Sequence, residues 1–250
     1  MSALLELDGL CRSFGAVTAV NAVSLQVAPR ERRAIIGPNG AGKTTLFNLV
    51  TGHLVPSRGR IVFDGRPLAG LPVHRIARLG VSRSFQRTNL FPRLSVLESL
   101  RLAAAADGRG SWDLLGPVAR LRAPLARARE VAEAVGLSAR LGEAAGRLSY
   151  GEQRQLEIGV ALAARPKLLL LDEPTAGMSP EETVQMTRLL AALPREVTLL
   201  IIEHDMDVVF SLADRITVLH HGEVLVEGPP SAVRVDPRVY EVYLGTGAEP

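Results

Sequence analysis

The sequence of 250 residues has a single cysteine, Cys11, and only two lysines, Lys43 and Lys167. One cysteine cannot form an intrachain disulfide or a cysteine-rich metal site, so the default expectation is a reducing, cytosolic compartment. No apolar run approaches the roughly 20 residues that a membrane-spanning helix needs. The first residues lack a basic stretch followed by a long apolar core, and we expect no secretory signal there.

Charge of neither sign is in large excess, since the formal net charge is +3 and nearly all the basic residues are arginine. An arginine-rich surface could meet nucleic acid or anionic lipid head groups, or it could be an ordinary solvated surface. The arginines are scattered along the chain, which favours the solvated surface. Apolar residues make up 47% of the chain and charged residues 22%, values typical of a globular protein with a substantial core.

The stretch Gly37-Pro38-Asn39-Gly40-Ala41-Gly42-Lys43-Thr44-Thr45 fits the phosphate-binding pattern Gly-x-x-x-x-Gly-Lys-Thr, the P-loop. It follows a short apolar strand and precedes a helix expected to end near Gly52. The glycines let several N–H groups point at one anion, with the helix dipole behind them. Lys43 would reach the β- and γ-phosphates, and the Thr44 hydroxyl would bind Mg²⁺. The alternative is a glycine-rich turn that binds nothing, but the complete motif in this context predicts a nucleoside triphosphate site.

The first third of the chain also contains strand signals. Apolar and polar residues alternate between Leu4 and Val27 with a period of two, which indicates antiparallel strands. Residues 61–66 predict a further strand that runs into an Asp64-Gly65 turn. A short helix is expected at 71–79, followed by a strand that ends in Gln86.

Helix-forming residues dominate from about residue 95 to residue 159. Capping boxes at Ser95-x-x-Glu98 and Ser149-x-x-Glu152 predict helices over 95–106 and 152–164, with another over 122–135 between them. We interpret this region as a helical subdomain inserted into a nucleotide-binding fold.

Two continuous apolar runs, 167–173 and 197–202, are typical of buried parallel strands. The helix between them is expected to begin at Ser179, with a proline and acidic residues in its first turn. A hairpin is expected at 216–226, and a last short helix near 236–244.

Two carboxylates, Asp172 and Glu173, end the first of these apolar runs. The carboxyl ends of parallel strands are where α/β sheets place reactive groups. Asp172 would hold Mg²⁺ directly or through water, and Glu173 could accept a proton from the attacking water. The alternative is an exposed acidic turn, which the P-loop upstream disfavours.

Three further candidates are weak when each is taken alone. His204 follows the run 197–202, although a lone histidine is more often a structural or surface residue. Gln86 follows a single expected strand. Phe14 could stack on a purine ring or pack in the core, and composition favours the core.

Taken together and in order, these motifs resemble those of the ATPase subunits of ABC transporters, over essentially the whole chain. The most specific is Leu148-Ser149-Tyr150-Gly151-Glu152-Gln153, which is similar to the family signature Leu-Ser-Gly-Gly-Gln. The resemblance implies that this signature binds the γ-phosphate held by the P-loop of a second subunit, so that two ATP molecules join a head-to-tail dimer. A helix N-terminus with a hydroxyl is an anion site, and a plain helix cap is the alternative.

The resemblance implies ATP and Mg²⁺ as cofactors and assigns the remaining roles. Glu173 resembles the catalytic base, and His204 resembles the switch histidine that contacts the γ-phosphate. Gln86 resembles the glutamine that touches Mg²⁺ and water and senses the membrane partner. The implied metal-binding residues are Thr44, Gln86 and Asp172. The implied nucleotide-binding residues are Phe14, as the adenine-stacking aromatic, with Asn39, Gly40, Ala41, Gly42, Lys43, Thr44, Thr45, Ser149, Gly151 and Glu152.

The sequence departs from the family pattern at two places. Tyr150 and Glu152 replace the commoner glycine and glutamine of the signature. Ala176-Gly177-Met178-Ser179 replaces the usual Ser-Ala-Leu-Asp, so Ser179 stands where an aspartate often bridges the dimer. Ser179 could make that contact or only cap its helix.

These variations themselves resemble one branch of the family. Four stretches occur together in this sequence: Tyr-Gly-Glu-Gln in the signature, Gly-Val-Ser-Arg-Ser-Phe-Gln before residue 87, Ile-Glu-His-Asp-Met-Asp around His204 and Tyr-Leu-Gly near the end. They are similar to the ATP-binding subunits of bacterial branched-chain amino-acid importers, with urea or short-chain amide importers as near relatives.

The expected fold class is α/β, a P-loop NTPase core with an antiparallel β subdomain and an inserted helical subdomain. One ABC ATPase domain would span 1–250. Within it, the core and the β subdomain would occupy 1–86 and 160–235, and the helical subdomain 87–159. A short C-terminal helix and tail would follow at 236–250.

The resemblance implies a peripheral subunit at the cytoplasmic face of the inner membrane, which hydrolyses ATP to drive solute import. Its partners would be integral-membrane permease subunits and a second ATPase, in a homodimer or in a heterodimer with a sister subunit. Residues 87–100 are our candidate for lining the docking groove of the permeases, and an ordinary surface loop is the alternative. A periplasmic solute-binding protein would be an indirect partner, and no nucleic acid is expected.

Urea or amide import and lipopolysaccharide export are the alternatives within the family. A soluble ABC ATPase that acts on DNA or ribosomes usually carries two nucleotide units or long coiled-coil inserts, whereas this chain has one P-loop and no heptad run. A nucleotide sensor without hydrolysis is disfavoured by Glu173.

Overall fold

The computed structural model describes residues 3–84, 90–106 and 119–244. The chain divides into two compact units, Met1–Ala77 with Arg195–Pro250, and Arg78–Pro194. No helix within the described ranges has the length and apolar character needed to cross a membrane. The boundaries at residues 87, 160 and 236 stay predictions.

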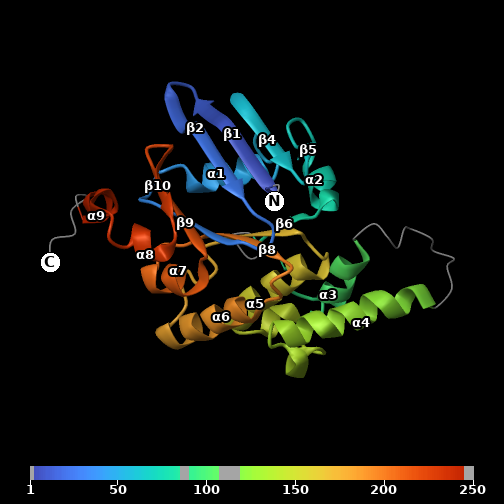
Figure 1. The fold of residues 1–250 in the computed structure, drawn as a ribbon. Coiled ribbons are helices and arrows are strands. Elements are labelled where there is room, and N and C mark those ends of the chain that lie inside the picture. Colours follow the sequence, from blue (N-terminus) through green and yellow to red (C-terminus); the bar gives the residue numbers. More distant parts are fainter. Residues whose placement is uncertain (1–2, 85–89, 107–118, 245–250) are drawn as a thin grey trace. The chain divides into compact units, whose positions relative to one another are not determined.

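The first unit contains a four-stranded antiparallel sheet, in the order β2-β1-β4-β5 (Figure 1). Its strands are β1 (Leu5–Phe14), β2 (Val17–Val27), β4 (Arg58–Phe63) and β5 (Arg66–Pro67). Asp64 and Gly65 connect β4 to β5 with φ angles of 49° and 72°, as a two-residue type I′ hairpin requires. The antiparallel strands and the Asp64-Gly65 turn predicted from the sequence are confirmed.

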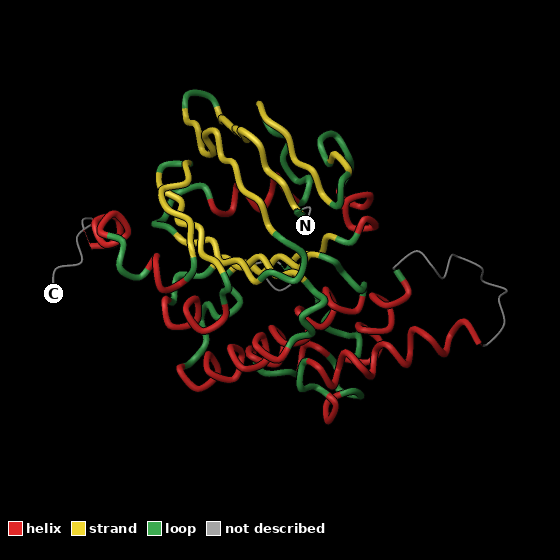
Figure 2. The backbone as a smooth tube through the Cα atoms, in the orientation of Figure 1, coloured by secondary structure: helices red, strands yellow, loops and turns green. Residues whose placement is uncertain are grey.

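The same unit contains a second, mainly parallel set of strands; Figure 2 draws the strands of both sets in yellow. β3 (Arg32–Ile36) pairs in parallel with β8 (Thr198–Ile202) on one side and with β9 (Arg215–His220) on the other. β10 (Glu223–Gly228) closes an antiparallel hairpin with β9. Every residue of β3 and β8 is buried, which explains the apolar run in β8 and requires partners for the two arginines of β3.

The helices assigned to this part of the chain begin with α1 (Lys43–Val50) and α2 (Val73–Leu79). α7 (Met206–Leu212), α8 (Pro230–Val233) and α9 (Pro237–Leu244) follow the later strands. Apolar residues of β3, β9, α7, α8 and α9 share one core cluster, which includes Ile36, Val209, Val218, Val233 and Val239. α7 was not predicted from the sequence.

The second unit is mainly helical. It contains α3 (Val96–Ala105), α4 (Ala119–Ala134), α5 (Tyr150–Ala163) and α6 (Pro180–Ala192), with 3₁₀ turns η1 (Ser138–Arg140) and η2 (Ala145–Arg147). β6 (Val81–Arg83) and β7 (Leu168–Asp172) pair in parallel in this unit. Reciprocal capping boxes at Ser95 and Ser149 confirm the predicted helix starts, and Ser179 forms a third.

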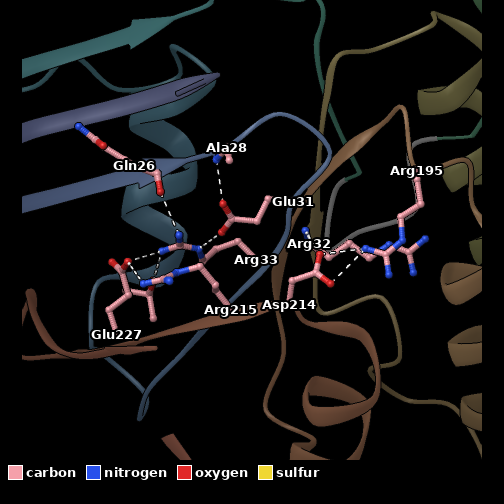
Figure 3. Close-up of polar contacts among 10 residues, drawn as sticks. Gln26, Ala28, Glu31, Arg32, Arg33, Arg195, Asp214, Arg215 and Glu227 are labelled. Atoms are coloured by element: carbon pink, nitrogen blue, oxygen red, sulfur yellow. Dashed lines mark hydrogen bonds and ion pairs between the residues drawn. The ribbon is translucent and has the colours of Figure 1, made fainter. Parts of the chain in front are cut away.

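A buried arginine in β3 connects the two sheets of the first unit (Figure 3). The Arg33 side chain is 1% exposed, and its Nε forms an ion pair with Glu31. Its Nη2 donates to the Gln26 carbonyl at 2.9 Å, and its Nη1 donates to the Thr217 hydroxyl at 3.0 Å. Arg33 Nη1 also forms an ion pair with Glu227, at 3.1 Å. A buried charge is tolerated only with partners of this kind, and these partners connect β3 to β2, β9 and β10.

We expect Arg33→Met to lower the free energy of unfolding by about 3–5 kcal/mol, because it leaves the largely buried Glu31 carboxylate without its ion pair. The measurement is urea denaturation of the whole chain. Arg60→Met is the matched control, since Arg60 pairs with Asp8 while the two side chains are 74% and 61% exposed. That control should cost less than about 1 kcal/mol. Equal small losses in both variants would contradict the prediction.

Candidate functional site

The P-loop lies between the end of β3 and the start of α1. Gly37, Gly40 and Gly42 have φ angles of 148°, 80° and 99°, values that residues with a side chain rarely adopt. Gly42 is also the N-cap of α1 and offers no side chain to its first N–H groups. These donors are therefore available to an anion at the helix N-terminus.

Two of these glycines lie too close to neighbouring strands to be replaced. A Cβ at Gly37 would lie 2.1 Å from the Leu219 carbonyl oxygen, and a Cβ at Gly42 would lie 2.3 Å from that of Ala19. A Cβ at Gly40 would meet no atom within 4 Å. The loop is thus packed at its two ends and open at its middle.

Hydrogen bonds hold the loop in this position. The Gly222 amide donates to the Ala41 carbonyl at 3.2 Å, and the Asn21 amide donates to the Gly222 carbonyl at 2.8 Å. The turn between β9 and β10 therefore connects the P-loop to β2.

Lys43, the first residue of α1, has its side chain folded over the loop. Its Nζ donates to the carbonyls of Gly37 at 2.6 Å and Pro38 at 2.9 Å, and the residue is buried. Phosphate oxygens can replace these carbonyls as acceptors. Thr44 is exposed and Thr45 is half-buried beside it. These groups fit the triphosphate of ATP.

Phe14 ends β1 and is 46% exposed, so it does not belong to the core. The Arg12 guanidinium lies 4.7 Å from its ring centroid. The interpretation of Phe14 as a core residue is therefore wrong, and adenine stacking stays a prediction.

His204 follows β8 and is exposed, with 65% of its side chain accessible. Its amide donates to the carboxylate of the neighbouring Glu203 at 3.1 Å, and Glu203 itself is buried. Asp205 caps α7 by accepting from the amides of Asp207 and Val208. The backbone of His204 is thus fixed on both sides, while its ring faces solvent.

Tyr243 in α9 packs against the apolar cluster of the first unit. Burial raises the pKa of its phenol to about 12, and the nearby backbone of Gly37 has the smaller, opposite effect on that pKa. The phenol is therefore neutral at physiological pH. This contact between α9 and the first glycine of the P-loop was not expected from the sequence.

In the second unit, β7 ends at Asp172 and β6 ends at Arg83. Arg83 Nη2 donates to Asp172 Oδ2 at 2.6 Å, and both side chains are buried. Glu173 follows with a φ of 49°, an uncommon conformation for a residue other than glycine that costs on the order of 1 kcal/mol and is found at functional sites. Gln86 lies outside the described residues, as do residues 87–89 of the expected docking segment.

The signature begins at the N-terminus of α5. Ser149 accepts from the Glu152 amide at 3.2 Å, and Glu152 accepts from the Ser149 amide at 2.9 Å. That backbone hydrogen bond and the 2.9 Å bridge from Arg140 hold the pKa of the Glu152 carboxyl below its ordinary value. Glu152 is therefore an anion at neutral pH, with Arg140 beside it.

The two departures from the family pattern contact each other. The Tyr150 hydroxyl donates to the Ala176 carbonyl at 2.9 Å, and its ring lies beside Gly177. A Cβ at Gly151 would lie 3.1 Å from a Glu182 carboxylate oxygen, so a side chain there would crowd the start of α6. Tyr150 thus connects the signature to the loop after β7.

Ser179 caps α6, as one of its two interpretations requires. Its hydroxyl accepts from the Glu182 amide at 3.2 Å and donates to the Glu181 carboxylate at 3.0 Å. A contact of Ser179 with a partner subunit, the other interpretation, stays a hypothesis. Ser149, Gly151, Glu152 and Glu182 line a polar pocket of about 240 Å³ in the second unit.

Within the described ranges, no three or more His, Cys, Asp or Glu side chains gather into a metal-binding group. Mg²⁺ in nucleotide sites usually takes one or two protein ligands together with phosphate oxygens and water. The Thr44 hydroxyl in the first unit and the Asp172 carboxylate in the second are each an oxygen donor of the kind that Mg²⁺ prefers.

A glycine loop between a parallel strand and a helix, with a buried lysine at the helix start, defines a P-loop nucleotide-binding protein. The family model described as ABC transporter matches residues 20–176. The chain belongs to this family, as one of its ATP-binding cassettes.

The chain is similar to the high-affinity branched-chain amino acid transport ATP-binding protein BraF of Pseudomonas aeruginosa, with 42% identity over 97% of this chain and 98% of that protein. Among solved structures, an ATP-binding cassette of an ABC transporter has 30% identity and a TM-score of 0.84 over 97% of this chain and 99% of that one. A dimeric bacterial ABC transporter cassette has 26% identity and a TM-score of 0.76, over 90% and 98%. These structures confirm the predicted fold class.

Lys43→Ala is expected to weaken ATP binding about 100-fold or more, because charge-assisted hydrogen bonds contribute about 1.5–3 kcal/mol each. Equilibrium binding of a fluorescent ATP analogue measures the change. Lys167→Ala is the matched control, since Lys167 is the only other lysine and is exposed. If Lys43→Ala binds ATP as tightly as the unmodified chain and Lys167→Ala do, Lys43 does not contact the phosphates.

Proposed function

We propose that this chain is the ATP-hydrolysing subunit of an importer for branched-chain amino acids. The observation that carries the proposal is the similarity to BraF over nearly the full length of both proteins. The solute does not contact this chain, because the subunit supplies energy to separate permeases. Urea or amide import and lipopolysaccharide export remain the alternatives that the test below separates.

In this proposal the chain binds ATP with groups that the first unit presents. The open side of the P-loop and the N-terminus of α1 bind the phosphates, Lys43 donates to the β- and γ-phosphate oxygens, and Phe14 stacks on the adenine. Asn39, Gly40, Ala41, Gly42, Thr44 and Thr45 complete the phosphate cradle. His204 contacts the γ-phosphate.

Thr44, Asp172 and Gln86 would hold Mg²⁺, which neutralises charge on the β- and γ-phosphate oxygens when bound. Glu173 accepts a proton from the water that attacks the γ-phosphorus. A positioned general base of this kind contributes about 10²–10⁴-fold in rate.

Hydrolysis in this proposal requires two subunits. Ser149, Gly151 and Glu152 at the start of α5 would contact the γ-phosphate on the P-loop of the partner subunit. The dimeric structure of a similar ABC transporter cassette supports assembly as a dimer. Because Glu152 is an anion, its bridge to Arg140 would offset the repulsion of the phosphate. The partner is a second copy or a sister ATPase.

The permeases would dock on the segment 87–100 and thereby hold the subunit at the cytoplasmic face of the inner membrane. Phe91, in the described part of this segment, is 64% exposed. An exposed aromatic side chain is a common anchor in a protein interface. A periplasmic solute-binding protein would act on the permeases from the other side.

Glu173→Gln should lower ATP hydrolysis about 100-fold or more and leave ATP binding intact, because only the proton acceptor is lost. The variant should therefore accumulate as an ATP-bound dimer, measured by light scattering after size-exclusion chromatography in saturating MgATP. Glu196→Gln, at an exposed carboxylate, should behave like the unmodified chain. If the unmodified chain hydrolyses ATP no faster than the Glu173→Gln variant, the chain is a nucleotide sensor and not an ATPase. A Glu173→Gln variant that stays monomeric would contradict the shared site.

The proposed role is tested by isolating the chain from gently solubilised native membranes and identifying the proteins that accompany it. We expect two polytopic permeases with a second ATPase subunit, and we expect Phe91→Ala to release them. If the isolated permeases belong to a urea, amide or lipopolysaccharide system, the chain serves that system and not amino-acid import. Recovery with ribosomes or nucleic acid would overturn the transport role.

A further inference from the structure

The two parallel strands of the second unit end in opposite charges. In the register of β6 and β7, Arg83 lies opposite Leu170, and its side chain reaches two residues further to Asp172. The Nη2 to Oδ2 distance is 2.6 Å, and the side chains of Arg83 and Asp172 are only 7% and 2% exposed. The pair is therefore almost completely removed from water.

A buried carboxylate is costly unless a cation or hydrogen-bond donors compensate it. In this structure Arg83 provides that compensation. A second cation at the same carboxylate would repel the guanidinium, and repulsion between buried charges is poorly screened. Full ion pairing by Arg83 and direct ligation of Mg²⁺ are thus competing uses of Asp172.

We propose that Arg83 neutralises Asp172 while no metal is bound and is displaced from Oδ2 when Mg²⁺ binds, so that it determines how strongly ATP binding depends on Mg²⁺. The inference rests on the proposed function, in which Asp172 is a ligand of that ion. Arg83 is a positioning residue, because it acts on the metal through the carboxylate.

Loss of Arg83 should have opposite effects on binding with and without Mg²⁺. The proposed function makes Asp172 a ligand of the Mg²⁺ that accompanies ATP. Without Mg²⁺, loss of Arg83 would then leave an uncompensated anion at that site, and ATP binding should weaken. With Mg²⁺, loss of Arg83 removes the competitor for Asp172, and the metal should bind more tightly. A residue that only stabilises the fold would change both conditions alike.

The test compares the dissociation constant of ATP in excess EDTA with that in saturating MgCl₂. The ratio is the dissociation constant in EDTA divided by that in MgCl₂. In Arg83→Met this ratio should rise roughly tenfold or more, since a buried charge beside Asp172 is removed. Arg83→Lys keeps the charge and should stay near the unmodified ratio. Arg154→Met is the matched control, because Arg154 forms another buried ion pair in this unit, with Glu157, and its ratio should not change.

Thermal unfolding first establishes which variants are folded. Arg83→Gln is the second test variant, because its neutral amide can still donate a hydrogen bond to Asp172, and its ratio should rise in the same direction. An unchanged or reduced ratio in folded Arg83→Met or Arg83→Gln would overturn the inference and leave the proposed function intact. Absence of ATP binding to the unmodified chain in both conditions would overturn the proposed function and the inference with it.

Discussion

The P-loop depends on two positions at which no side chain fits. The carbonyls of Leu219 in β9 and Ala19 in β2 approach Gly37 and Gly42 so closely that a Cβ would overlap them. Both sheets of the first unit therefore pack against bare backbone at this point. The same packing leaves the middle of the loop and the start of α1 open, so the fold and the anion site depend on the same two glycines.

Arginine, the dominant cation of the sequence, provides buried positive charges in both units. Arg33 satisfies carboxylates and carbonyls around β3, and Arg83 and Arg154 each pair with a buried carboxylate in the second unit. The planar guanidinium has several donors in fixed directions, so one side chain can satisfy acceptors on different strands. In the first unit, the lysine at position 43 is instead surrounded by backbone carbonyls, which a phosphate can replace.

Local signals allowed much of the fold to be predicted, because capping boxes and apolar runs lie within a few residues of the elements that they define. α7 was missed, although Asp205 followed by the buried Val208, Val209 and Leu212 is a helix signal. The pairs Arg83–Asp172 and Tyr150–Ala176 join residues 89 and 26 positions apart. Such contacts depend on strand register and helix packing, which no short motif encodes. For the same reason, the sequence did not indicate Arg140 or Tyr243.

The hydrogen bond from Tyr150 to Ala176 closes a loop of the chain that contains the whole of α5 and β7. Ala176 lies three residues beyond Glu173, and its amide donates to the Glu173 carbonyl at 3.2 Å. The first turn of α5 and the backbone of Glu173 are therefore joined by two hydrogen bonds in series, in addition to the chain between them.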